Sequence, residues 1–392
     1  MELADQTIEK FSSSEPSDFI VIGAGMAGAS VAYELAALGR VTLLEREDQP
    51  GYHTTGRSAA LFLESYGNAT MRALARAGRG FYLAPPPGFA STPILTPRGS
   101  LLVGTAVQRE ALEAYLAASS QVVQGLAMWS GAQVRERVPA FTPQQVDAAV
   151  WEPDAMDIDV HALHQGFLRG MRARGGLLRC GAEVEGLASH GGRWQVPTRA
   201  GDFSAPVLVN AAGAWAEVIG QMAGAAPIGL RPLRRTAITF DAPAGASLHD
   251  WPAVVDVDET YYFKPEGGRL LASPADETPS PPCDAQPEDY DIAVLVDRLC
   301  KATTLKVPRI HSRWAGLRSF VADRTLVAGY DPRAQGFFWL AGQGGYGIQT
   351  AAGASRAAAA LITGRALPSD LQDLGVRAED LAASRSCIGA RP

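Results

Sequence analysis

The sequence predicts an α/β protein with two domains. The first domain is built on a parallel sheet, and the second is an α+β domain built on a mixed, largely antiparallel sheet. Residues 18–44 run through strand, glycine-rich turn, helix and strand, which is the βαβ order of a parallel sheet. Residues 206–212 form a continuous apolar run, as buried parallel strands do. Residues 231–240 and 253–265 instead alternate in character with turn signals between them, which predicts antiparallel strands.

The composition narrows the class of protein. A chain of 392 residues with 47% hydrophobic and 19% charged residues predicts a folded globule of more than one domain. A net charge of −6 without clustered Lys or Arg argues against nucleic acid as a partner, because binding it needs a basic face. Because residues 1–18 lack the regions of a signal peptide and no run reaches about 18 apolar residues, we expect no transmembrane segment and a cytoplasmic protein. The four scattered cysteines predict neither a disulfide framework nor a metal site.

The turn GAGMAG carries the first functional signal. Gly23 permits the tight turn after the strand, Gly25 lets a pyrophosphate approach the backbone, and Gly28 lets helix and strand pack closely. The helix that follows offers free N–H groups and a positive dipole to phosphate. Glu45, at the end of the next strand, is placed to bind a ribose hydroxyl. A Rossmann-type dinucleotide site is predicted, and a turn that serves only packing is the alternative.

Three further segments favour FAD over NAD as the dinucleotide. Residues 51–58 form a loop rich in glycine and hydroxyl groups, and residues 211–215 form a small-residue turn after a strand. Residues 342–350 open the last Ala-rich helix, whose N-terminus suits the negative charge that develops on a reduced flavin. Each segment alone is also explained by turn chemistry. Together they predict a long cofactor that is held at several points.

On five segments the chain resembles the D-amino acid oxidase and dehydrogenase branch of the FAD-dependent oxidoreductases, which includes glycine and sarcosine oxidases. It is most similar to the D-arginine dehydrogenases of that branch. The segments are VIGAGMAGAS from Val21, LLEREDQPGYHTTGRSAA from Leu43, VNAAGAW from Val209, WAGLRSFVAD from Trp314 and GQGGYGIQT from Gly342. The resemblance implies a Rossmann-type FAD-binding domain of residues 1–85, 151–224 and 314–392. A substrate domain of residues 86–150 and 225–313 is interleaved with it.

The resemblance also implies which residues contact FAD, and all but one of them lie in these five segments. They are Gly23, Gly25, Met26, Ala27, Gly28, Glu45, Arg46, His53, Thr54, Thr55, Gly56, Arg57, Ser58, Ala60, Val184, Ala212, Gly213, Trp215, Gly316, Arg318, Gly344, Gly345, Tyr346, Gly347, Ile348 and Gln349. Some relatives tether the flavin to a cysteine near the active-site arginine. Residues 319–325 contain none here, so we expect non-covalent FAD.

Two sets of histidines need a separate interpretation. His53 lies in the loop expected to wrap the cofactor, so a structural hydrogen-bonding role is predicted rather than that of a catalytic base. His161 and His164 are three residues apart on a predicted helix and have no third ligand in view. They are predicted to be surface residues rather than a metal site.

Four residues match the substrate-binding positions of the family. Arg318 matches the arginine that pairs with the substrate carboxylate, and a guanidinium suits that bidentate grip. Arg235 matches a second such arginine, and strand alternation directs its neighbour Arg234 to the opposite face. Tyr66 and Tyr262 match two active-site tyrosines, whereas from the residues alone they are equally core tyrosines.

The predicted side-chain pocket departs from that of the D-arginine dehydrogenases. It consists of Leu61, Leu63, Ser100 and Gly345, with Leu61 in place of a histidine and Ser100 in place of the glutamate that binds the guanidinium. A buried cation without a partner is costly, so a neutral or apolar side chain is predicted to be preferred over a cationic one. Glu64 would supply a substitute carboxylate if it faced inward.

The hypothesis for function is oxidation of the Cα–N bond of a D-amino acid. Hydride transfer to flavin N5 would give an imino acid, which water hydrolyses to a 2-oxo acid. The alternatives are an oxidase of N-alkyl amino acids or other secondary amines, and a flavoprotein subunit that turns over no substrate. The electron acceptor, whether oxygen, a quinone or another compound, is left open.

Overall fold

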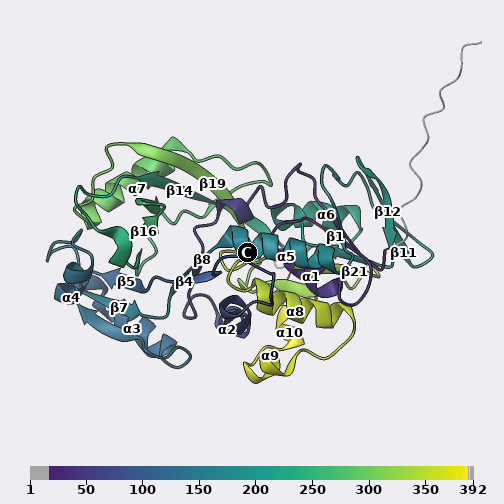
Figure 1. The fold of residues 1–392 in the computed structure, drawn as a ribbon, viewed down its shortest axis with the longest axis horizontal. Coiled ribbons are helices and arrows are strands. Elements are labelled where there is room, and N and C mark those ends of the chain that lie inside the picture. Colours follow the sequence, from purple (N-terminus) through teal and green to yellow (C-terminus); the bar gives the residue numbers. More distant parts are fainter. Residues whose placement is uncertain (1–16, 387, 389–392) are drawn as a thin grey trace, which may run out of the picture.

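The structure is a computed structural model that describes residues 17–386 and 388. Two large sheets lie toward opposite ends of its long axis, with helices between and beside them (Figure 1). Cys387 and the first sixteen residues, on which parts of the disulfide and signal-peptide predictions rest, lie outside the described residues.

The first sheet is the predicted parallel sheet. Its six strands run in the order β20-β21-β13-β1-β2-β9, and every neighbouring pair is parallel except β20 and β21. The strands are β1 (Phe19–Ile22), β2 (Val41–Leu44), β9 (Leu177–Arg179), β13 (Val207–Asn210), β20 (Val327–Tyr330) and β21 (Phe337–Ala341). The turn after β1 and the turn after β13 therefore meet at the carboxyl edge, where ligands of open α/β sheets bind.

Both faces of this sheet are covered, which explains its continuous apolar strands. One face packs on a helical layer of α1 (Met26–Leu35), α5 (Val160–Ala173) and α8 (Ala351–Ile362), with α2 (Ala69–Leu83) against α8. The other face packs on α6 (Ala216–Met222) and a small antiparallel sheet of β10 (Ala188–His190), β11 (Arg193–Thr198) and β12 (Gly201–Ala205).

The second sheet is mixed and largely antiparallel, as predicted. Its path is β18-β14-β17-β16-β15-β5-β7-β6, β19 also pairs with β14, and only β5 and β15 are parallel. The strands are β5 (Ser100–Gly104), β6 (Ala127–Ser130), β7 (Ala148–Glu152), β14 (Arg231–Phe240), β15 (Ala253–Asp256), β16 (Tyr262–Glu266), β17 (Arg269–Ser273), β18 (Thr278–Pro279) and β19 (Ile310–Phe320). The predicted α/β fold class with a second, largely antiparallel sheet is confirmed.

Helices close the second sheet on both faces. α3 (Arg109–Ser119) packs on β5 and β7, whereas α4 (Gly131–Arg137) and α7 (Asp289–Ala302) contribute to the core on the opposite face. Since β7 and β19 extend across the predicted limits at residues 150 and 314, the division into domains stays a prediction.

The segment from Arg57 to the first long helix corrects one expectation. The Ala- and Leu-containing residues after Arg57 suggest a continuous helix, but they form the short strand β3 (Leu61–Phe62) and a turn before α2. The helix starts where Asn68 caps it, with the side chain accepting a hydrogen bond from the Met71 N–H. β3 belongs to a small sheet with β8 (Met156–Ile158) and β4 (Leu95–Pro97).

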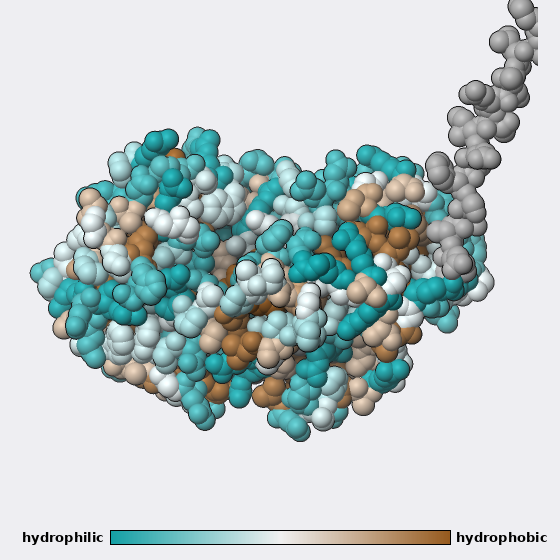
Figure 2. Space-filling model, viewed as in Figure 1, coloured by the Kyte–Doolittle hydropathy of each residue, from teal (hydrophilic) through white to brown (hydrophobic). Residues whose placement is uncertain are grey.

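The chain ends in the short helices α9 (Ser369–Asp373) and α10 (Ala378–Leu381) beside α8 (Figure 1). Figure 2 shows a mostly hydrophilic to neutral face with scattered apolar patches near its middle and on its right side. Throughout residues 17–386, no helix has both the length and the hydrophobicity needed to cross a membrane.

Candidate active site

A cavity of about 410 Å³ joins the carboxyl edge of the first sheet to one face of the second. Its wall is formed by the turns after β1 and β13, by residues 51–66, by strands of the second sheet, and by residues 343–349. All predicted substrate residues line it, and so do all predicted FAD residues except Gly28, Gly56 and Tyr346. Segments far apart in sequence thus contribute to one continuous space.

The glycine turn has the shape that a pyrophosphate requires. Gly23 has a φ of +96°, and a Cβ there would lie 2.5 Å from the Ala211 carbonyl oxygen. A Cβ on Gly28 would lie only 1.8 Å from the Gly23 carbonyl oxygen, so Gly28 packs the helix onto the turn from behind the cavity wall. At Gly25 the nearest atom is the Thr55 hydroxyl at 3.3 Å, which leaves the start of α1 accessible from the cavity.

Residues around this turn fix its conformation. Glu45 accepts hydrogen bonds from the Ala24 N–H at 2.8 Å and from the Glu47 N–H at 3.0 Å. The Thr55 hydroxyl accepts from the Met26 N–H at 2.9 Å. Each carboxylate oxygen of Glu45 has a second lone pair, so binding of a ribose hydroxyl stays a prediction.

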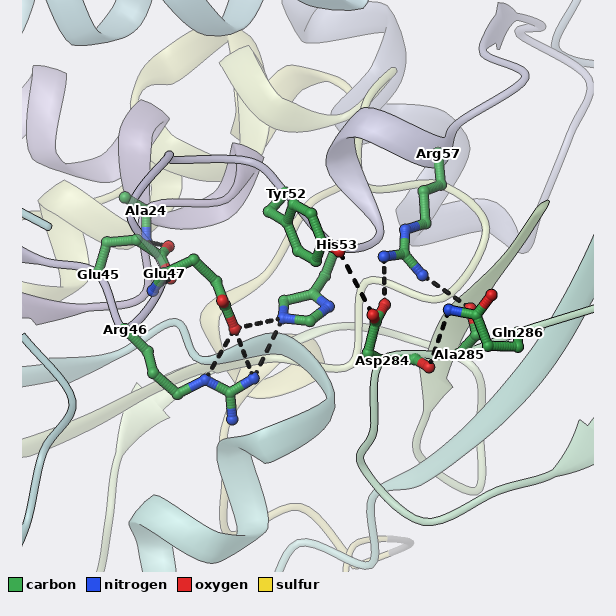
Figure 3. Close-up of polar contacts among 10 residues, drawn as sticks. All are labelled: Ala24, Glu45, Arg46, Glu47, Tyr52, His53, Arg57, Asp284, Ala285 and Gln286. Atoms are coloured by element: carbon green, nitrogen blue, oxygen red, sulfur yellow. Dashed lines mark hydrogen bonds and ion pairs between the residues drawn. The ribbon is translucent and has the colours of Figure 1, made fainter. Parts of the chain in front are cut away.

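His53 belongs to a polar cluster at the edge of the cavity (Figure 3). Its Nε2 lies 2.9 Å from Glu47 Oε1, to which Arg46 also donates at 2.7 Å. Arg46 in turn lies over the Trp215 ring, 4.2 Å from its centroid. Burial opposes ionisation of Glu47, but hydrogen bonds from Arg46 and His53 outweigh it and lower the pKa of Glu47. The cluster matches the predicted structural role of His53.

Arg57 connects the loop of residues 51–58 to Asp284 and Ala285, as Figure 3 shows, and also to Ala315 of β19. Its Nη1 donates to the carbonyl oxygens of Ala285 and Ala315 at 2.8 and 3.0 Å, and its Nη2 pairs with Asp284. The Tyr52 hydroxyl donates to the same carboxylate at 3.3 Å. The guanidinium is therefore occupied by protein groups, although Arg57 also lines the cavity. We call these contacts the Asp284 tether.

The predicted substrate residues converge on the other end of the cavity. Arg318 lies on β19 and Arg235 on the neighbouring strand β14, where Arg235 pairs with Gly316 in the register. Arg235 is buried and donates to the Asp276 carbonyl oxygen at 2.7 Å. Arg234 faces away and donates to Asp291 on α7 at 2.9 Å. Alternation along the strand thus separates the two arginines.

The electrostatics of this end favour an anion. Burial and the nearby charge of Arg318 lower the pKa of Arg235. Burial also opposes the charge of Arg318, but the hydroxyls of Tyr66 and Tyr262 and the carboxylate of Glu277 outweigh it, so the pKa of Arg318 is raised. Within the described chain, Arg318 forms no ion pair with a carboxylate. Arg235 already pairs with Glu277 at 3.3 Å, so Arg318 is the guanidinium of the two that would gain most from a bound carboxylate.

Residues 342–350 complete this end. A Cβ on Gly345 would lie 2.9 Å from Arg318 Nη1 and 3.2 Å from the Tyr66 hydroxyl, so glycine keeps the space beside both groups open. Tyr346 lies behind the wall, with its ring 4.8 Å from that of Tyr66, and burial raises its pKa to about 12. Its ring packs against that of Tyr66, and its contact with FAD stays a prediction. Gly56 also lies behind the wall, where its N–H donates to the Gly51 carbonyl oxygen.

For Glu64 the condition of facing inward is not met, and for His164 the predicted surface position is wrong. Glu64 does not face the cavity, because it pairs with Arg76 and Arg79 of α2 at 3.7 and 3.6 Å. His164 is not a surface residue, because it is 3% exposed and its Nε2 lies 2.9 Å from the Ala24 carbonyl oxygen. Burial lowers the pKa of His164. No group of His, Cys, Asp and Glu with metal-binding geometry occurs among the described residues.

The sequence did not reveal a buried acid on the wall. Glu152, at the end of β7, is 5% exposed and pairs in register with Ser100 of β5. It accepts hydrogen bonds from the Ser65 hydroxyl and from the Glu64 N–H. The alternating strand pattern of residues 148–152 was the available signal, since it places Val150 and Glu152 on one face.

Comparisons with known proteins agree with this arrangement. The chain is 25% identical to the mitochondrial dimethylglycine dehydrogenase of Mus musculus over 275 residues, which is 66% of this chain and 30% of that protein. It is 28% identical to the D-amino-acid oxidase of Streptomyces coelicolor over 241 residues, covering 60% of this chain and 67% of that protein. The chain thus spans under a third of the length of the dimethylglycine dehydrogenases that it matches.

Among solved structures, the glycine oxidase of Geobacillus kaustophilus superposes with a TM-score of 0.82 at 19% identity. The superposition covers 95% of this chain and 99% of that one, so the whole fold is shared. The model of a family described as FAD dependent oxidoreductase matches residues 18–361. The chain therefore belongs to the FAD-dependent oxidoreductase family, and its cofactor is FAD.

Proposed function

We propose that the protein oxidises the Cα–N bond of a D-amino acid and prefers a neutral side chain over a cationic one. The observation that carries the proposal is the pair of guanidinium groups, Arg318 and Arg235, in the same cavity as the glycine turn. The hydroxyls of Tyr66 and Tyr262 line the same space. A carboxylate is the anion that this set of planar and hydroxyl donors fits.

The residues of the site act by binding and orientation. Arg318 holds the substrate carboxylate, Arg235 adds a second positive charge, and the two tyrosine hydroxyls donate further hydrogen bonds. Gly345 leaves the space in which the group next to the carboxylate must lie. Bound FAD supplies the acceptor for a pair of electrons and a hydrogen.

The reaction balances without a strongly basic side chain. The amino acid gives its Cα hydrogen with the bonding electrons to the bound cofactor and one N–H proton to water, and a C=N bond forms. Water then adds to that bond and ammonia leaves, which gives the 2-oxo acid. No strongly basic side chain is required if the substrate amine loses its proton before or during binding.

Two features of the cavity support the proposed preference for a substrate with a neutral side chain. Leu61 and Ser100 line the cavity where the D-arginine dehydrogenases are expected to carry a histidine and a glutamate. Glu152 restores a carboxyl group nearby, but burial and the neighbouring charge of Glu64 outweigh its hydrogen bonds and raise its pKa. A carboxyl group that is protonated more readily attracts a cation less strongly.

The second candidate is oxidation of an N-alkyl amino acid. The match to dimethylglycine dehydrogenases favours it, and the carboxylate grip of Arg318 serves both reactions equally. A flavoprotein subunit without turnover is the third candidate. The three differ in which compound transfers electrons to bound FAD.

Anaerobic reduction of the FAD absorbance separates the candidates. Neutral D-amino acids are expected to bleach the flavin faster than their L-enantiomers, than N-methyl and N,N-dimethyl glycine, and than D-lysine. Faster bleaching by an N-alkyl amino acid would select the second candidate. If no amino acid in the panel reduces the flavin, the proposal is wrong.

FAD is expected to leave the protein on denaturation. Within the described chain no cysteine lines the cavity, since Cys180, Cys283 and Cys300 lie elsewhere. Acid precipitation should therefore leave the yellow flavin in the supernatant, as measured by its absorbance. Flavin that stays with the precipitated polypeptide after washing would contradict non-covalent binding.

A further inference from the structure

The cavity continues past the carboxylate-binding residues along one face of the second sheet. Tyr262 of β16 pairs in register with Val255 of β15, Val255 with Leu102 of β5, and Leu102 with Val150 of β7. All four line the cavity. With strands about 4.8 Å apart, three strand spacings separate the Tyr262 and β7 backbones by roughly 14 Å. The pocket is therefore longer than a small side chain such as that of alanine requires.

The far end of this row is polar. Glu152 lies two residues beyond Val150 on the same face of β7, opposite Ser100. Ser65, which precedes α2, and Tyr115, which lies on α3, also line the cavity there. The Tyr115 hydroxyl lies near Ser65 and Glu152. An apolar stretch thus leads to a buried cluster of one carboxyl and three hydroxyl groups.

The hydrogen bonds of Glu152 leave part of its capacity unused. One oxygen accepts from the Glu64 N–H at 3.1 Å and the other from the Ser65 hydroxyl. Within residues 17–386, Glu152 pairs with no arginine, lysine or histidine. A carboxyl group has about four lone-pair sites, so a further donor can bind, and a buried polar group gains most from such a partner.

We infer that Glu152 forms the end of the substrate pocket and selects amino acids whose side chain ends in a neutral hydrogen-bond donor. This inference rests on the proposed function and narrows its substrate class to side chains that end in a carboxamide or ureido group. Such groups both donate and accept, so they pair with a carboxyl group in either protonation state. Leu102, Val150 and Val255 contact the methylene groups that lead to it.

Matched substrates test the inference in the wild-type protein. D-Glutamine and D-homoleucine have similar shapes, and only the first carries N–H donors. The ratio of reduction rate to dissociation constant, measured anaerobically in a stopped-flow instrument, should favour D-glutamine by about 10- to 100-fold. D-Citrulline and D-arginine provide a second pair, in which the neutral ureido group should exceed the guanidinium.

Two substitutions of Glu152 test whether its carboxyl group causes the preference for D-glutamine. Glu152→Leu should bring the D-glutamine to D-homoleucine ratio close to one, and Glu152→Gln should retain part of it. Asp154→Asn is the matched control, because Asp154 is an acid two residues from Glu152 whose exposed side chain pairs with Arg79 outside the cavity. It should keep the wild-type ratio. Absorbance of bound FAD checks that each variant folds.

Equal rates for D-glutamine and D-homoleucine in the wild-type protein would overturn the inference, and this comparison needs no variant. So would a Glu152→Leu protein that keeps the preference, or D-arginine exceeding D-citrulline. If neither member of either pair reduces the flavin while an N-alkyl amino acid does, the proposed D-amino acid oxidation has failed instead.

Discussion

Arg318→Ala is expected to lower the ratio of flavin reduction rate to substrate dissociation constant by about 10²- to 10⁴-fold, because losing one partner of a buried charge pair costs about 3–5 kcal/mol. In the proposed function this guanidinium binds the substrate carboxylate, so its loss should affect both the affinity for substrate and the orientation of Cα. FAD should stay bound, since Arg318 is one of many predicted FAD contacts and the glycine turn is fixed by hydrogen bonds to Glu45 and Thr55. Anaerobic stopped-flow reduction with a neutral D-amino acid measures the loss.

Two companion variants make the result specific. Arg313→Ala removes an arginine from the exposed start of the same strand, where it pairs with Asp289, and should reduce flavin at the wild-type rate. Arg318→Lys keeps the charge without the planar fork and should recover part of the loss. An Arg318→Ala protein with full activity and bound FAD would remove the carboxylate grip from the mechanism.

Gly28→Ala is expected to abolish stable FAD binding although Gly28 does not line the cavity. The added Cβ would lie 1.8 Å from the Gly23 carbonyl oxygen, so the helix must move away from the turn. Overpacking costs about 3 kcal/mol when the backbone must shift. If this strain falls on the turn in its FAD-bound conformation, the dissociation constant of FAD rises roughly 100-fold. The absorbance ratio of flavin to protein after gel filtration reports the loss.

Gly80→Ala is the matched control for that substitution. Gly80 is an exposed residue within α2, and a Cβ there meets no atom within 4 Å. Replacing a helical glycine with alanine stabilises by about 0.5–1 kcal/mol, so this variant should keep its FAD and unfold at a slightly higher temperature. A Gly28→Ala protein with full FAD content and unchanged stability would contradict the close packing of α1 on the turn.

Local patterns were sufficient to predict most of the fold. The order of strand, glycine turn and helix in residues 18–44 depends on neighbours in sequence, and the structure has β1, α1 and β2 there. The start of α2 was harder, because the helical texture after Arg57 carries no sign of the turn that ends at the Asn68 cap. Which strands pair in the second sheet, such as β5 with β15 in parallel, depends on contacts distant in sequence.

The same distinction applies to the site. Alternation along one strand was enough to separate Arg235 from Arg234. Glu152 was missed because its position opposite Ser100 follows from the register of β5 and β7, which lie about 50 residues apart along the chain. Glu64 was considered because it is near Tyr66 in sequence, but two arginines of α2 hold it outside the cavity.

The Asp284 tether has a kinetic consequence for the cofactor. Residues 51–58 lie over the glycine turn, and Arg57 and Tyr52 fasten them to Asp284, Ala285 and Ala315. We expect FAD to dissociate when that loop lifts, and lifting it breaks contacts that belong to the protein rather than to FAD. The activation barrier for release thus includes the cost of opening the tether, which does not enter the equilibrium affinity when the loop closes again afterwards. We therefore expect the residence time of FAD to depend on the Asp284 tether as well as on the strength of the contacts of FAD itself.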